Sequence, residues 1–328
     1  MRCLLRPVST LFVLLVSVAT LASCGGISSP SSLQKTVTPT PAPSKTLYML
    51  TELGVGAFRA DNGQQIWTFP LKDSLDGYAM TIAQGVVYVA HSTSVYALDA
   101  KTGKSIWTGI GSSDPEQMAA LDAYVYVASA CTIYSYNTKD GSLAWRKDIP
   151  TVNLSSNDTH YVGTKVFVEN NLVYGWCGDS IAAFNPGNGN ITWRISLPAH
   201  LSDNSDSRIE DVAVTPGVLV IKSQNTSNLQ PATGEVIGVK PDDGTQLWKI
   251  AAQDGVHVAN NIVYIYRYND NQQGITLSAV GLQDGNQQWS VSDPAVDSQS
   301  PLTFSDTAFY AATGPSGGDL DVHSLQDG

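Results

Sequence analysis

Short runs of β-branched and aromatic residues alternate with polar turns along most of the chain. In the clearest example, Val86 to Ala90 reads VVYVA and Val95 to Ala100 reads VYALDA. A third run, Ser105 to Ile110, reads SIWTGI, and polar turns separate the three. Such runs, bounded by Gly, Asn, Asp and Ser, are typical of β-strands. With Tyr78 to Ala83 as a fourth strand, this stretch predicts one four-stranded antiparallel sheet.

This arrangement recurs, because a short turn ending in Gly is followed four residues later by Trp in six places. The pairs are Gly63 with Trp67, Gly103 with Trp107, Gly141 with Trp145, Gly189 with Trp193, Gly244 with Trp248, and Gly285 with Trp289. A seventh turn ends the chain at Gly328. The glycines stand about 40 to 55 residues apart, close to the period of one propeller blade. We predict an all-β fold, a β-propeller of four-stranded blades with about seven blades visible and seven or eight in the natural ring.

The first and last blades are expected to be incomplete. The chain enters at Thr46 to Leu50, which corresponds to the second strand of a blade, and it stops after the third strand of the last blade. Either the reading frame is truncated or a partner closes the ring, since open sheet edges invite aggregation.

Two further positions keep a constant distance from the turn glycine. A small residue stands six positions before the first six of them: Ala57, Ala97, Ser135, Ala183, Gly238 and Ala279. A tyrosine stands fifteen positions before four of them: Tyr48, Tyr88, Tyr126 and Tyr174. We expect each Trp ring to dock over the gap above the small residue and to lean on the neighbouring blade. Seven independent hairpins in a β-sandwich are the alternative, which six matches at constant spacing disfavour.

The segment from Ala97 to Trp107 (ALDAKTGKSIW) resembles the tryptophan-docking motif of the pyrroloquinoline-quinone (PQQ)-like β-propeller repeat family. The resemblance extends from about residue 46 to the C-terminus and implies structural docking roles for the six Trp and six Gly residues above. Asp99 stands at the motif's Asp, and other residues replace it elsewhere: Arg59, Asn137, Asn185, Lys240, Gly281 and Ser324. In the last repeat Val322 replaces the small residue, which puts docking there in doubt.

The N-terminus is typical of an export signal. Arg2 and Arg6 precede an apolar stretch at 11–22, which is too short to span a bilayer as a helix. Leu21-Ala22-Ser23-Cys24 then resembles the bacterial lipobox, which implies that Cys24 is diacylated and becomes the mature N-terminus. An ordinary signal peptide cut beside a Cys is the alternative. Two or three acyl chains would anchor a soluble domain stably to a membrane.

These features predict three segments: a lipoprotein signal peptide at 1–23, the lipidated Cys and a Ser/Thr/Pro-rich linker at 24–45, and a PQQ-like propeller domain at 46–328. The linker has too little apolar surface to fold. We therefore expect an exported protein, anchored by its N-terminal lipid on the extracytoplasmic face of the cell envelope.

Composition narrows the range of partners. The chain has 28 Gly and 16 Pro, a charged fraction of 14% and a formal net charge of -11. This composition is typical of a turn-rich β protein. It argues against a nucleic-acid partner, which needs clustered Lys and Arg.

The family resemblance raises an enzyme hypothesis, because PQQ-dependent dehydrogenases use this propeller with a calcium ion. Those enzymes carry a vicinal Cys-Cys pair that this sequence lacks. Five histidines are scattered without metal-ligand spacing: His91, His160, His200, His257 and His323. We expect His91 in a turn between strands. Two polar clusters are expected to be solvated loops: Asp203, Asp206, Glu210 and Asp211, and Asn269, Asp270 and Asn271. We predict no cofactor, no metal and no catalytic residue.

Cys131 and Cys177 each follow the second strand of a blade, in blades three and four. Export permits a disulfide between them. A bond requires Cα atoms within about 7 Å, and adjacent blades at that radius could hold them farther apart. The sequence leaves both outcomes open.

Second-to-third loops and blade-to-blade connections emerge on one face of a propeller, which we call the long-loop face. Three long polar segments fall in these classes: 150–162, 198–208 and 223–234. We expect Trp176 and Tyr161 to add aromatic surface there. Loops held by a rigid scaffold are where binding usually resides, although neutral drift also lengthens loops. The hypothesis is a protein or glycan partner at this face.

The sequence thus favours a noncatalytic, membrane-anchored scaffold for protein binding or assembly. Fold and anchor together resemble the propeller lipoproteins of the outer-membrane protein assembly machinery. The alternatives are a PQQ-dependent dehydrogenase-like quinoprotein and a ligand-sensing propeller domain.

Overall fold

The computed structural model describes residues 45–51, 53–71, 78–152, 163–197, 206–226, 233–252, 254–268, 273–297, 302–305, 307–313 and 319–324. The signal peptide, Cys24 and nearly all of the linker lie outside these ranges. The chain divides into two compact units, Met1–Asp73 and Ser74–Gly328. The first contains β1–β3, and the second contains β4–β26.

The strands form seven antiparallel sheets in chain order, which we number as blades 1 to 7. Blade 1 comprises β1 (Thr46–Thr51), β2 (Gly54–Arg59) and β3 (Gln65–Pro70). Blade 2 comprises β4 (Tyr78–Ala83), β5 (Val86–His91), β6 (Ser94–Asp99) and β7 (Ser105–Ile110). Blade 3 comprises β8 (Gln117–Leu121), β9 (Tyr124–Ser129), β10 (Thr132–Asn137) and β11 (Leu143–Asp148). Blade 4 comprises β12 (Thr164–Glu169), β13 (Leu172–Cys177), β14 (Ser180–Phe184) and β15 (Ile191–Ser196).

The remaining strands complete the second unit. Blade 5 comprises β16 (Asp206–Thr215), β17 (Val218–Thr226), β18 (Thr233–Val239) and β19 (Gln246–Ala252). Blade 6 comprises β20 (Gly255–Ala259), β21 (Ile262–Tyr268), β22 (Gln273–Gly281) and β23 (Gln287–Asp297). Blade 7 comprises β24 (Thr303–Phe304), β25 (Ala308–Thr313) and β26 (Asp319–Ser324). One residue pair, Val296 with Thr313, joins β23 to β25.

The predicted all-β propeller of four-stranded blades is confirmed. Five blades have four strands paired in chain order, and no described residue is helical. Blades 1 and 7 have three strands each among the described residues. None of the described segments forms a helix suited to crossing a membrane.

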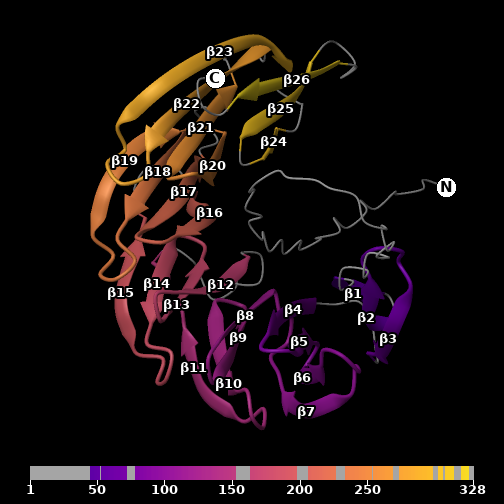
Figure 1. The fold of residues 1–328 in the computed structure, drawn as a ribbon. Helices are drawn as coiled ribbons and strands as arrows, with labels where there is room; N and C mark the ends of the chain where they lie inside the picture. Colours follow the sequence, from indigo (N-terminus) through magenta and orange to yellow (C-terminus); the bar gives the residue numbers. More distant parts are fainter. Residues whose placement is uncertain are drawn as a thin grey trace, which may run out of the picture. The chain divides into compact units, whose positions relative to one another are not determined.

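Consecutive blades of the second unit pack against each other, and Figure 1 shows them following in chain order. Among the first strands of blades 2, 3 and 4, β8 contacts both β4 and β12. A cluster of buried side chains lies at each junction from blades 2 and 3 to blades 6 and 7. The core is therefore divided among blade interfaces, as expected for a repeat fold.

In each of blades 1 to 6, one residue from each of the three outer strands lies side by side with the other two in the register. In blade 2 the register pairs Tyr88 with Ala97 and Ala97 with Trp107, and the two rings lie 5.9 Å apart. The small residue leaves room for the indole. In blade 5 this residue is Gly238, where an added Cβ would lie 2.2 Å from a Trp248 ring atom. Similar tilted ring pairs join Tyr48 to Trp67, Tyr126 to Trp145, Tyr174 to Trp193 and Tyr264 to Trp289.

Four of the indoles also contact the turn of the next blade. Trp145 Nε1 donates to the Pro186 carbonyl at 2.8 Å, and its ring leaves no space for a Cβ on Gly189. Glycine is therefore required at position 189 for two reasons: its φ is +68°, and the neighbouring ring fills the space that a side chain would need. Three other indoles donate in the same way: Trp107 to Thr138, Trp193 to Pro241 and Trp248 to Leu282.

In blade 1, Trp67 docks within its own blade. Its ring is buried over Ala57 and lies 5.9 Å from the Tyr48 ring, so docking within the blade is as expected. Its expected contact with blade 2 would join the two units and stays a prediction. Its turn glycine, Gly63, has a φ of +70°, which favours glycine, and a Cβ added there would meet nothing within 4 Å. The docking role of Gly63 stays a prediction.

Blade 5 differs from the sequence-based expectation. Strand β16 begins at Asp206, and β17 extends to Thr226 before β18 begins at Thr233. Parts of the predicted loops 198–208 and 223–234 are thus strand. The alternation of Val218, Val220 and Lys222 continues into polar residues, and this masked the strand ends.

Candidate functional site

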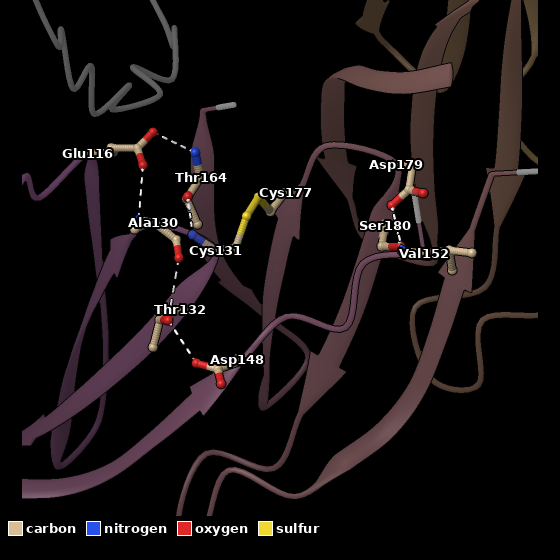
Figure 2. The surroundings of a disulfide bond; sticks show 10 residues. All are labelled: Glu116, Ala130, Cys131, Thr132, Asp148, Val152, Thr164, Cys177, Asp179 and Ser180. Atoms are coloured by element: carbon tan, nitrogen blue, oxygen red, sulfur yellow. Dashed lines mark hydrogen bonds between the residues drawn. A yellow bond between two sulfur atoms is a disulfide. The ribbon is translucent and has the colours of Figure 1, made fainter. Parts of the chain in front are cut away.

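On the long-loop face, blades 3 and 4 are joined by a disulfide and by the hydrogen bonds of two carboxylates. A disulfide joins Cys131, in the turn between β9 and β10, to Cys177 at the end of β13. Their Cα atoms lie 5.3 Å apart, inside the range of about 4.4–6.8 Å that a disulfide allows. The two adjacent blades therefore approach closely enough at this radius to be bridged (Figure 2).

A carboxylate beside the disulfide ties the same blades through their backbones. Glu116 lies in the connection between β7 and β8 and accepts hydrogen bonds from the Ala130 and Thr164 amides. The Thr164 hydroxyl in turn accepts from the Cys131 amide at 2.8 Å. Figure 2 shows these groups in a chain from Glu116 to Cys131. The Ala130, Cys131 and Thr164 amides at this junction thus all have hydrogen-bond partners.

A second carboxylate holds the connection that follows β11. Asp179 is 1% exposed, and its Oδ1 accepts from the Val152 amide at 3.3 Å and from the Ser180 hydroxyl at 2.9 Å. The Ser180 hydroxyl also bonds the Ser196 hydroxyl on the neighbouring strand β15. The backbone at Val152 is therefore held against blade 4 (Figure 2).

Two exposed aliphatic side chains of the second unit lie on this face. Ile110, at the end of β7, is 86% exposed, and Val152 is 60% exposed. By contrast, the expected aromatic surface at Trp176 is wrong, because this ring is buried against Ile181 and Ile209. Trp176 faces blade 5 because the residues of β13 alternate between the two neighbouring blades.

Several expected surface elements lie outside the described residues. They include 153–162, with His160 and Tyr161, 198–205, with His200 and Asp203, 227–232, and Asn269, Asp270 and Asn271.

The polar clusters within the described residues have structural partners. Glu210 and Asp211 lie within β16, not in a solvated loop. Glu210 pairs with Lys222, and Asp211 accepts from the Val212 amide. His91 ends β5 and stacks on Tyr78 at 4.5 Å, so its placement in a turn was wrong. The described side chains include no group of three or more His, Cys, Asp or Glu that could hold a metal ion.

The cofactor of the quinoprotein enzymes does not fit this chain's cysteines. Those enzymes were expected to need a vicinal Cys pair, whereas Cys131 and Cys177 bond to each other across two blades.

Sequence reasoning found the tryptophans, the glycines and the cysteines of this region but missed Glu116, Thr164 and Asp179. None of the three occupies a repeated position, so the blade pattern gives no signal for them. A Glu in a Gly/Ser/Asp-rich connection is the only hint that the sequence offers.

Comparison with known proteins agrees with this architecture. A family model described as outer membrane protein assembly factor BamB matches residues 52–229 and 214–328. No curated protein sequence matches the chain. The solved structure of BamB from Moraxella catarrhalis is similar, with a TM-score of 0.55 and 17% identity over 85% of this chain and 81% of that one.

Two enzymes have similar folds. The dihydro-heme d1 dehydrogenase NirN matches with a TM-score of 0.53 and 13% identity over 84% of this chain and 60% of that one. A europium-containing methanol dehydrogenase matches with a TM-score of 0.51 and 11% identity over 85% and 76%. At such identities the likeness shows the fold alone.

Proposed function

Because the chain belongs to the family of the outer membrane protein assembly factor BamB, we propose that it is a noncatalytic scaffold that binds protein partners outside the cytoplasm. The family match over residues 52–328 carries this proposal. The cross-linked face of blades 3 and 4 supports it. A surface that is already ordered loses little conformational entropy when a partner binds.

The docking surface in this proposal is the long-loop face around Ile110 and Val152. Single exposed aliphatic side chains are common on protein surfaces. Here the backbone of Val152 is fixed by a buried carboxylate, and this fixes where its side chain is presented. An aliphatic anchor of this kind suits a protein partner better than a glycan.

Photocrosslinking in the native membrane tests this surface. A benzophenone amino acid replaces Val152 or Ile110, and matched controls carry it at Ile106 and Leu143 on the outermost strands. These control residues are also exposed aliphatics, at 52% and 55%. We expect discrete protein adducts from the first pair only. Adducts of equal yield from all four positions would contradict the assignment of the face.

The membrane anchor is part of the same proposal. We infer that Cys24 is lipidated after removal of residues 1–23 and that 24–45 tethers the folded part. Cys24→Ala should move the protein from the membrane fraction to the soluble exported fraction and abolish incorporation of labelled fatty acid. Retention of the label in the variant would refute lipidation at this residue.

A PQQ-dependent dehydrogenase is the competing function, which the resemblance to the PQQ-like repeat family raises. Reconstitution with PQQ and calcium separates the two ideas. The scaffold proposal predicts no quinone absorbance retained on the protein after desalting and no dye reduction with alcohols. Stoichiometric retention of quinone would favour the enzyme.

A further inference from the structure

A cavity of about 350 Å³ lies between blades 5 and 6. Blade 5 contributes Gly234, Ile250 and Ala251 to its lining. Blade 6 contributes Ile265, Tyr266, Arg267, Thr276, Ser278, Val280 and Gln287. The volume falls within the range of about 300–1,000 Å³ that is usual for small-molecule sites.

The two walls differ in chemistry. The blade 5 wall is apolar, whereas the blade 6 wall carries paired hydroxyls. Ser278 bonds Ser290 at 2.9 Å, and Thr276 bonds Ser292 at 3.0 Å, because the register sets these residues opposite each other on β22 and β23. Each hydroxyl of a pair keeps further capacity to accept hydrogen bonds.

In blade 5, apolar packing occupies the place that this polar wall takes in blade 6. In blade 5 the register position equivalent to Ser278 is Ile237, which is buried against blade 4. A serine at that place has too little volume to fill the junction with blade 5. The cavity therefore follows from the sequence of β22.

Arg267 supplies the charge of the cavity. Among the described residues of the lining it is the only charged one, and its side chain is exposed. Among the described residues no ion pair or hydrogen bond holds its guanidinium. Two acids of blade 5 have partners of their own: Glu210 pairs with Lys222, and Glu235 pairs with Lys249 at 2.9 Å.

The Asp254 carboxylate also has a partner, since it accepts from the Tyr268 amide at 2.7 Å. The Asp254 backbone carbonyl accepts from Lys222 Nζ at 2.7 Å. The cations and anions around the cavity thus leave Arg267 as the group available to an anionic ligand.

We propose that this cavity binds a small sugar that carries a carboxylate. A guanidinium binds a carboxylate through two parallel hydrogen bonds. The Ser and Thr hydroxyls and the Gln287 amide match the hydroxyls of a sugar ring, and Ile250 and Ile265 offer surfaces to its apolar face. This site goes beyond the protein-scaffold function and lies on blades other than its proposed docking surface.

Binding of D-glucuronate to the full chain tests the proposal, with D-glucose as the neutral sugar of the same ring. Saturation-transfer NMR and isothermal titration report the two affinities. We expect glucuronate to bind at least about tenfold more tightly than glucose, since charge-assisted bonds are the stronger ones. Equal affinities, or no glucuronate binding at millimolar concentration, would overturn the proposal.

Three variants locate the site. Arg267→Gln should remove the preference for glucuronate, while Arg194→Gln, an exposed arginine on β15, should retain it. Ile250→Trp fills the cavity without touching its charge and should abolish binding of both sugars. Circular dichroism checks that each variant is folded. Full glucuronate binding by folded Arg267→Gln or Ile250→Trp protein would contradict the site, whatever the outcome of the crosslinking at Val152.

Discussion

The junction between blades 3 and 4 and the junction between blades 5 and 6 are built from the same repeat but differ in how they are held. Both have an indole that donates to the next blade, Trp145 in one and Trp248 in the other. The first junction adds a disulfide and the Glu116 network, whereas the second has a polar wall and a cavity.

The docked indole is thus the common element of the two junctions, and the rest of each junction varies. A side chain that recurs from blade to blade supplies stability, while residues outside the repeat supply properties of individual junctions. Binding sites are therefore to be sought where the repeat pattern is broken.

The largest effect is expected from removing a common indole. Trp145→Ala should lower the free energy of unfolding by about 3–5 kcal/mol, because a buried ring and its hydrogen bond are lost. The matched change Trp289→Ala should cost clearly less, since that indole is half-buried and its Nε1 has no hydrogen-bond partner among the described residues. Urea unfolding measures both. Equal losses would show that the contact with the next blade does not stabilise the fold.

The next largest effect is expected from removing the disulfide at the junction of blades 3 and 4. Replacing Cys131 and Cys177 with Ser should cost about 2–4 kcal/mol, as expected for a disulfide that closes a 46-residue separation. Reductant should destabilise the wild type by a similar amount and leave the double variant unchanged. Intact-mass measurement with and without reductant checks the bond itself. Two free thiols in non-reduced protein would contradict the cross-link.

A smaller effect tests the polar side of the second junction. Lys222→Met should cost about 1–3 kcal/mol, because the partly buried Glu210 loses its cation and the Asp254 carbonyl loses a donor. Lys249→Met breaks the exposed pair with Glu235 and should cost less than about 1 kcal/mol. Thermal unfolding at matched pH compares them. A larger loss from the Lys249 variant would mean that Lys222 does not hold the junction.

The smallest effect is a pH dependence at the junction of blades 2 and 3. Burial raises the pKa of Tyr136 to about 12, above its ordinary value of 10.0. Since the neutral phenol is favoured in the fold, its contribution to stability is present below pH 10 and is lost as pH rises from 10 toward 12. Absorbance at about 295 nm, where tyrosinate absorbs, should show a late component that Tyr136→Phe reduces but does not remove, since burial also raises the pKa of Tyr126 and Tyr174. Ionisation of every tyrosine near pH 10 without unfolding would contradict this burial.

Much of the fold could be predicted from the sequence because its determinants repeat. The spacing from Tyr88 through Ala97 to Trp107 recurs in other blades, and the register places these residues side by side. In blade 6 the pair is Tyr264 with Trp289, which the fixed spacing missed because β22 and its loop lengthen the repeat.

The contacts that join one blade to the next could not be predicted from the repeat pattern. Each turn glycine was paired with the Trp four residues after it, whereas the ring beside Gly189 is Trp145 of the preceding blade. The four-residue spacing is conspicuous in the sequence, and the contact across a blade is not. Glu116 likewise acts through neighbours that only the folded chain brings near.

Hydrogen exchange followed by mass spectrometry tests most directly that the junction of blades 3 and 4 is clamped and that of blades 5 and 6 is open. Peptides from β9, β10, β12 and β13 should exchange more slowly than those from β18, β19, β21 and β22, and reductant should accelerate only the first group. Equal protection of the two groups in the oxidised protein, or no change on reduction, would contradict the account.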